Sequence, residues 1–176
     1  MAIEIERKFL VKNDEYKSGA KGTYYRQGYI SIDNRRVVRI RIAGKHAFLT
    51  FKSLISERSR SEYEYKIPVH DALELLDKLC LKPIIEKIRY EINYDGDCWI
   101  VDEFLGENAS LIVAEIELES EDQKFSKPSW LGKEVSADPR YLNANLVINP
   151  YRKWQWFRGE YGYNMLKSHL GEFSIL

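Results

Sequence analysis

Residues 3–11 read Ile-Glu-Ile-Glu-Arg-Lys-Phe-Leu-Val, and this stretch decides the fold. Apolar and charged side chains alternate along most of it, which is typical of a β-strand with one apolar and one charged face. Residues two apart on a strand lie on the same face, roughly 6.6 Å from each other. The charged face of this strand therefore carries Glu4, Glu6 and Lys8.

The same alternation recurs along most of the chain and predicts a set of strands. They are Ile3–Val11, Thr23–Ile32, Arg36–Ala43, His46–Lys52, Glu62–Ile67, Ile84–Tyr94, Asp97–Phe104 and Ser110–Glu119. Short turn sequences such as Asp33-Asn34 and Asp95-Gly96 separate neighbouring strands, which favours antiparallel pairing. We expect a mainly β fold of the α+β class, in which these eight antiparallel strands make a sandwich or a closed barrel.

A few helices should flank the strands. The first is expected after Pro68, and its apolar face consists of Ala72, Leu73, Leu76 and Leu79. A second, short helix is expected after Asp138-Pro139-Arg140. We interpret residues 1–150 as one domain and residues 151–176 as an aromatic tail that packs on the barrel or caps it.

The charged faces of the expected strands carry side chains of like charge. The pairs are Glu4 and Glu6, Arg39 and Arg41, Glu62 and Glu64, Lys87 and Arg89, and Glu115 and Glu117. A sandwich would leave these faces in water, but solvated faces usually mix charges of both signs. Like charges this close repel each other, so neutralising partners should lie nearby. A divalent cation suits the carboxylates, and a polyanion suits the arginines and lysines. A barrel that enclosed these faces would be a charged tunnel.

Composition excludes several classes of protein. The chain has 176 residues, with 27 Lys and Arg balanced by 27 Asp and Glu, so bulk attraction to nucleic acid or to a membrane surface is not expected. We also see no apolar stretch near the roughly 18 residues that a membrane helix needs. Cys80 and Cys98 match no metal or redox spacing, which fits a reducing, cytoplasmic location. Both a monomer and a homodimer remain open.

Several segments resemble, in order, those of a known family. They are Glu4-Ile5-Glu6-Arg7-Lys8, which has the pattern ExExK, then Val38–Ile42, Leu49–Lys52, Arg60–Tyr65, Lys87–Arg89 and Ala114–Leu118. The chain resembles the CYTH superfamily, also called triphosphate tunnel metalloenzymes, and in length the short prokaryotic inorganic tripolyphosphatases. The resemblance implies an eight-stranded antiparallel tunnel that binds a triphosphate together with Mg²⁺ or Mn²⁺.

The resemblance also implies roles for the charged residues. The carboxylates expected to hold metal are Glu4, Glu6, Glu62, Glu64, Asp102, Glu115 and Glu117. Among them, Asp102 would orient a basic residue or reach the metal through water. The basic residues expected to clamp the phosphates and to act in catalysis are Lys8, Arg39, Arg41, Lys52, Lys87 and Arg89. Lys133 would contact the substrate at the tunnel mouth.

The expected reaction is metal-dependent hydrolysis of the terminal phosphoanhydride of inorganic tripolyphosphate. Other triphosphate chemistry in the same tunnel stays open, namely that of a thiamine triphosphatase, a nucleoside triphosphatase or a class IV adenylate cyclase. A polyphosphate-binding module without turnover is a further alternative. The acidic pairs favour an enzyme, because binding a polyanion alone gives no reason for so many carboxylates.

Overall fold

The computed structural model describes residues 5–33, 36–56 and 59–154. Its strands are β1 (Ile5–Val11), β2 (Thr23–Ile32), β3 (Arg36–Ala43), β4 (His46–Ser56), β5 (Ser59–Ile67), β6 (Ile85–Tyr94), β7 (Asp97–Phe104), β8 (Ile112–Leu118) and β9 (Leu131–Glu134). Its helices are α1 (Val69–Lys78), α2 (Asn143–Ile148), α3 (Tyr151–Trp154) and the 3-10 turns η1 (Asp14–Lys17), η2 (Gly106–Asn108) and η3 (Pro139–Tyr141).

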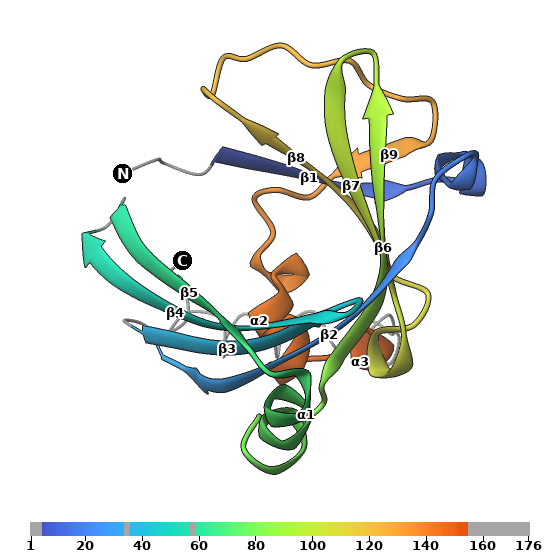
Figure 1. Cartoon of the computed structure of the whole chain (residues 1–176). Coiled ribbons are helices and arrows are strands. Elements are labelled where there is room, and N and C mark those ends of the chain that lie inside the picture. The colour runs from blue at the N-terminus through green and yellow to red at the C-terminus, as the bar shows by residue number, and fades with distance from the viewer. Residues whose placement is uncertain (1–4, 34–35, 57–58, 155–176) are drawn as a thin grey trace, which may run out of the picture.

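All nine strands belong to one strongly curved sheet, in the order β5-β4-β3-β2-β6-β7-β8-β1-β9 (Figure 1). Every neighbouring pair is antiparallel, so the expected mainly β, antiparallel fold is confirmed. The sheet has one strand more than the eight expected, because β9 adds to the free edge of β1. Among the described residues β5 and β9 are the two ends of the sheet.

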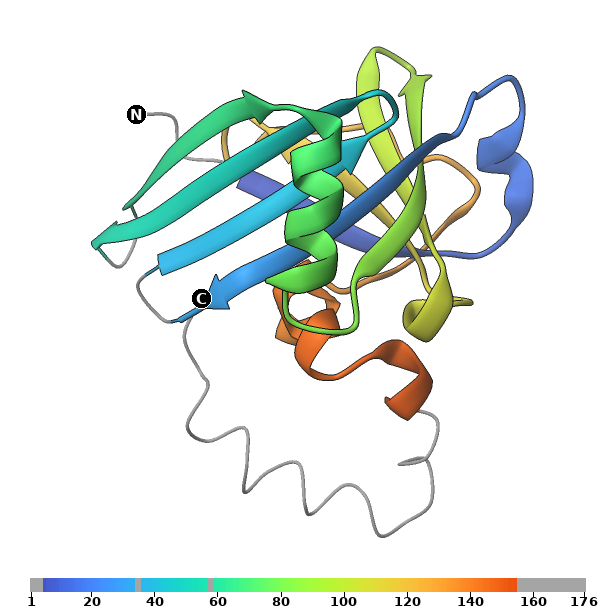
Figure 2. The ribbon, with the colours of Figure 1, turned by 60° about the horizontal axis from the view of Figure 1, so that its bottom comes forward.

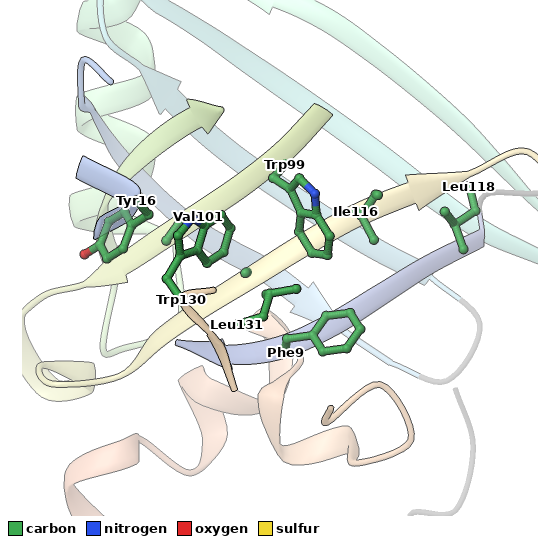
Figure 3. Close-up of a cluster of buried hydrophobic side chains, with 9 residues drawn as sticks. Phe9, Tyr16, Trp99, Val101, Ile116, Leu118, Trp130 and Leu131 are labelled. Carbon is green, nitrogen blue, oxygen red and sulfur yellow. The ribbon is translucent and has the colours of Figure 1, made fainter. Parts of the chain in front are cut away.

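The outer face of the sheet is largely apolar and much of it is covered, although Phe51, Tyr63 and Tyr65 on β4 and β5 are 41–57% exposed. Over β1, β7 and β8 it carries a core of large side chains that includes Phe9, Trp99 and Ile116, closed by Tyr16 of η1 and by Trp130 (Figure 3). Helix α1 crosses the outer face of the β2–β4 part of the sheet (Figure 2). The helices and loops outside the sheet therefore bury its apolar side over β1, β7 and β8 and beneath α1.

The apolar face expected for α1 is only partly correct. Ala72 and Leu76 are fully buried against β3 and β4, whereas Leu73 is 43% and Leu79 is 57% exposed. The buried stripe continues instead to Cys80, four residues beyond Leu76. The helix rests on the sheet along one side only, so a stripe with a spacing of four residues is enough to cover it.

The inner face of the sheet carries the charged side chains. Here the inner face means the side that bears Lys8, Arg41, Lys87 and Asp102, of which all but Arg41 are buried. The pairing register places these residues beside other inner-face residues, since Lys8 lies opposite Glu115. The charged faces are thus enclosed by the curvature of the sheet, and the sandwich with solvated charged faces is wrong.

An apolar cluster fills one end of this inner face. Leu146 and Val147 of α2 pack there against inner-face residues that include Tyr29, Ile85 and Phe104. Figure 1 shows α2 within the curve of the sheet, whereas α1 lies outside it. The short helix expected after Asp138-Pro139-Arg140 is confirmed, and its side chains form part of this apolar cluster, called the α2 cluster below.

Replacing Leu146 by alanine is expected to lower the free energy of unfolding by about 2–5 kcal/mol, because the side chain is fully buried in the α2 cluster. Urea unfolding of both proteins measures the change. Ile148→Ala is the matched control on the same helix, since Ile148 is 63% exposed, and its effect should stay within about 0.5 kcal/mol. Equal losses in the two variants would contradict the packing described for α2.

The expected boundary at residue 150 falls between two short helices. Helix α3 follows Pro150 and is held to η2, the turn between β7 and β8, because the backbone N–H of Tyr151 donates to Asn108 Oδ1 at 2.8 Å. Trp154 also packs against the α2 cluster. The rest of the expected aromatic tail, 155–176, lies outside the described residues. Within the described part of the chain, no helix is long and apolar enough to span a membrane.

Candidate active site

The first half of the inner face pairs arginines of β3 with glutamates of β5. Arg41 Nη2 donates to both carboxylate oxygens of Glu64 at 3.0 Å, and Arg39 Nη2 lies 3.4 Å from the same carboxylate. At the next position along the strands, Lys52 Nζ lies 2.9 Å from Glu62 Oε2. The side chains of Arg39, Arg41 and Lys52 are 17–27% exposed, so each is confined but accessible.

The second half of the inner face centres on a buried carboxylate. Asp102 of β7 accepts hydrogen bonds from Lys87 Nζ at 2.5 Å and from Arg89 Nε and Nη2 at 2.8 and 2.6 Å. The side chains of Lys87 and Asp102 are 1% and 0% exposed, whereas that of Arg89 is 16% exposed. Of these three residues, Arg89 is therefore the one that can meet a ligand.

The charge state of this group follows from its surroundings. Burial raises the pKa of Asp102, but the neighbouring Lys87 and Arg89 outweigh burial and hold that pKa below its ordinary value. Burial lowers the pKa of Lys87, and the Asp102 carboxylate opposes the shift only in part. Asp102 is thus the ionised member that keeps two confined cations together.

Lys8 joins the carboxylates of β1 and β8. Its ammonium lies 2.8 Å from Glu6 and 2.8 Å from Glu115. Burial alone would lower the pKa of Lys8, but the charges of Glu115 and Glu6 outweigh burial and raise it. Glu117 lies directly opposite Glu6 in the register of the two strands.

Aromatic rings support three of the cations, each at about the distance of a cation–π contact. The Arg41 guanidinium lies 5.2 Å from the Phe48 ring centre, Lys87 Nζ lies 5.4 Å from that of Phe104, and the Arg89 guanidinium lies 5.1 Å from that of Tyr25. Tyr25 and the buried Gln27 were not expected in the site. The alternation of β2 would have placed them on one face, but neither carries a formal charge to mark that face.

The remaining expected residues fall at the edge of this arrangement. Lys133 is exposed on the end strand β9. The pKa of Asp138 is lowered because hydrogen bonds from Arg140 outweigh burial, and Lys133 adds a smaller charge effect. Lys133 is therefore close enough for its charge to act on the Asp138 carboxylate. Glu4 lies outside the described residues.

The donor set suits a hard divalent cation. Carboxylate oxygens are the ligands that Mg²⁺ and Mn²⁺ prefer, and Glu6 and Glu117 face each other across β1 and β8 as like charges. In 5–33, 36–56 and 59–154, no three acidic, histidine or cysteine side chains converge as a ready-made metal site. Glu6 and Glu115 meet at Lys8, and Glu117 lies opposite Glu6, so these carboxylates fit the donor type that a hard divalent cation prefers.

Residues 2–147 match the CYTH domain family. The chain belongs to the CYTH family. It is 54% identical over 155 residues to an inorganic triphosphatase of Acetivibrio thermocellus, an alignment that covers 88% of this chain and 99% of the relative. It is 37% identical over 151 residues to an inorganic triphosphatase of Nitrosomonas europaea, with 83% and 97% covered.

The fold agrees with a solved structure of the same kind. The crystal structure of the inorganic triphosphatase NE1496 is 36% identical to this chain, and the two superpose with a TM-score of 0.64. The match covers 84% of this CYTH chain and 96% of the other. The expected family and fold are thereby both confirmed.

Proposed function

We propose that this protein is a hydrolase that cleaves the terminal phosphoanhydride of inorganic tripolyphosphate in a metal-dependent reaction. The observation that carries the proposal is the enclosed inner face. Four basic side chains there are partly exposed and each is paired with a carboxylate; they are Arg39, Arg41, Lys52 and Arg89. Two relatives that align over nearly their whole length are named inorganic triphosphatase, which supports the same substrate. The two free cysteines support a cytoplasmic location.

The metal would be Mg²⁺ or Mn²⁺, held by Glu6, Glu115 and Glu117 together with Glu4. When bound, it supplies charge neutralisation at the phosphate oxygens and polarises the bond that breaks. Glu62 and Glu64 are the candidates for holding a second ion, although each is also paired with a basic side chain.

The basic residues act on the substrate itself. Arg39 and Arg41 on β3 and Lys52 on β4 bind phosphate oxygens from one half of the inner face, and Arg89 and Lys8 bind them from the other. Charge that develops on the leaving phosphate is stabilised by donors that are already oriented, so little reorganisation is needed. The apolar cluster around Leu146 closes one end of this space, which favours a substrate without a bulky group at that end.

Release of inorganic phosphate from tripolyphosphate in the presence of Mg²⁺ tests the proposal. We expect kcat/KM for tripolyphosphate to exceed that for thiamine triphosphate and for nucleoside triphosphates. A higher kcat/KM for one of the latter would mean that the protein is a hydrolase and that tripolyphosphate is not its preferred substrate. Binding of tripolyphosphate without any phosphate release would show that the protein is a binding module and not a hydrolase.

Replacing Arg41 by alanine is expected to lower kcat for tripolyphosphate about 10²-fold, the scale for one lost donor in an oriented site. Its guanidinium is held by Glu64 and Phe48, so it is presented in one orientation. Arg36→Ala is a matched control, because Arg36 begins the same strand with a side chain that is 77% exposed. Steady-state kinetics of both variants measure kcat for tripolyphosphate. If Arg41→Ala lowers kcat less than twofold, Arg41 does not act on the substrate.

A further inference from the structure

Asp102 is the most completely enclosed charged group of the inner face. Three donors point at its two oxygens, and together they occupy most of the roughly four lone-pair positions of a carboxylate. The Asp102 side chain has no exposed surface. A metal ion could reach these oxygens only by displacing Lys87 or Arg89.

The geometry of the pair with Arg89 is that of a clamp. Nε and Nη2 of Arg89 donate to separate oxygens of Asp102, which fixes the plane of the guanidinium. The Tyr25 ring lies 5.1 Å from the guanidinium carbon and restricts it from another side. These bonds use Nε and one N–H of Nη2, and Glu115 Oε2 lies 3.9 Å from Nη2, so we expect Nη1 to donate to a phosphate oxygen.

Lys87 adds a second cation to the clamp. Arg89 and Asp102 alone would form a neutral pair, whereas the group of three has two cations and one carboxylate. The next negative charge is that of Glu115, whose Oε2 lies 3.9 Å from Arg89 Nη2. Because the Lys87 side chain is 1% exposed, we expect its ammonium to act through Asp102 and not on a ligand directly. Its ammonium also packs on the Phe104 ring, which holds it in place.

We propose that Asp102 is a positioning residue that fixes Arg89 for phosphate binding, with Lys87 as its counter-charge, and that Asp102 does not ligate the metal. This inference rests on the proposed function. It gives Asp102 a different role from Glu6, Glu115 and Glu117, although all four are carboxylates on the same face.

The test is Asp102→Asn, which keeps the size of the side chain and removes its charge. We expect kcat for tripolyphosphate to fall about 10- to 100-fold, the scale found when a group that orients another is lost. The dissociation constant of Mn²⁺, measured by calorimetry without substrate, should stay within about twofold of the wild-type value, since a positioning residue leaves the metal ligands intact. A rise of tenfold or more in that constant would make Asp102 a ligand and overturn the inference.

Asp102→Asn leaves two confined cations without their carboxylate and could therefore fail to fold. A second variant controls for this outcome. The double variant Lys87→Met/Asp102→Asn removes one cation and one anion. Its kcat should remain about 10- to 100-fold below that of Lys87→Met alone, because Arg89 has still lost its clamp. Equal kcat values for these two proteins would show that Asp102 positions nothing. Glu103→Gln is the control on the same strand, since Glu103 contacts Tyr16 and Lys17 on the outer face.

The clamp can also be tested without turnover. Tripolyphosphate added in the presence of EDTA should raise the melting temperature of the wild type, and Asp102→Asn should lose most of that rise. If the wild type binds tripolyphosphate but releases no phosphate once Mg²⁺ is supplied, the proposed hydrolase fails and the clamp is still tested by binding. If Asp102→Asn is protected as well as the wild type, the clamp fails and the hydrolase is unaffected.

Discussion

Removal of divalent metal with EDTA is expected to lower phosphate release from tripolyphosphate by about 10³-fold or more. The scale follows from the several kcal/mol by which a metal ion stabilises developing charge, at about 1.4 kcal/mol for each tenfold in rate. Without the ion, the negative charges of Glu6, Glu115 and Glu117 are not offset, and they oppose the negative charge that develops on the phosphate during cleavage. Mg²⁺ or Mn²⁺ should restore the rate, and Ca²⁺ should restore it poorly, because its coordination is larger and more irregular.

The control for this experiment is the fold of the metal-free protein. The buried ion pairs of Lys87 and Arg89 with Asp102 need no metal, so EDTA should leave the cooperative thermal transition in place. Loss of activity together with loss of that transition would point to a structural metal. Full activity in EDTA would remove the metal from the proposed reaction.

Alternation along the strands was enough to predict which side chains share a face. A period of two is a strong constraint, because a slip of one residue would reverse every side chain of a strand. Arg39, Arg41, Lys87 and Glu115 all lie on the inner face as expected. The pairs of like charge within single strands then indicated that this face is enclosed, since a solvated strand usually mixes charges of both signs.

Other features depend on contacts between segments that are distant in the sequence. β9 has four residues and no alternation long enough to be recognised, and it is a strand because the edge of β1 accepts it. The burial of Asp102 and Lys87 likewise follows from the curvature of β6 and β7. The sequence left two roles open for Asp102, orienting a basic residue or reaching the metal through water, because burial is not visible in a pattern of charge.

Glu117→Gln and Glu115→Gln are each expected to reduce turnover about 10³-fold or more, while their effects on stability without metal should differ in sign. Glu117 is exposed and lies opposite Glu6, and like charges directly opposite on paired strands are destabilising. Replacing Glu117 with the amide of equal size removes that repulsion. In EDTA the melting temperature of Glu117→Gln should therefore equal or exceed that of the wild type.

Glu115 has a different environment, because its Oε1 accepts a hydrogen bond from the buried Lys8 Nζ at 2.8 Å. Its replacement by glutamine removes a charge-assisted hydrogen bond, which costs about 1.5–3 kcal/mol. In EDTA the melting temperature of Glu115→Gln should thus fall below that of the wild type. The two variants separate repulsion from pairing on the same strand.

Mg²⁺ then distinguishes metal ligands from other carboxylates. The wild type should gain about 2.7 kcal/mol of stability when Mg²⁺ exceeds its dissociation constant a hundredfold, and both variants should lose most of that gain. Thermal melts of the three proteins with and without Mg²⁺ measure the response. Glu91→Gln on β6 is a matched control, since it is an exposed strand glutamate outside the proposed ligand set. If all four proteins gain equally from Mg²⁺, β8 does not hold the metal, because a ligand cannot be removed without weakening the binding that produces the gain.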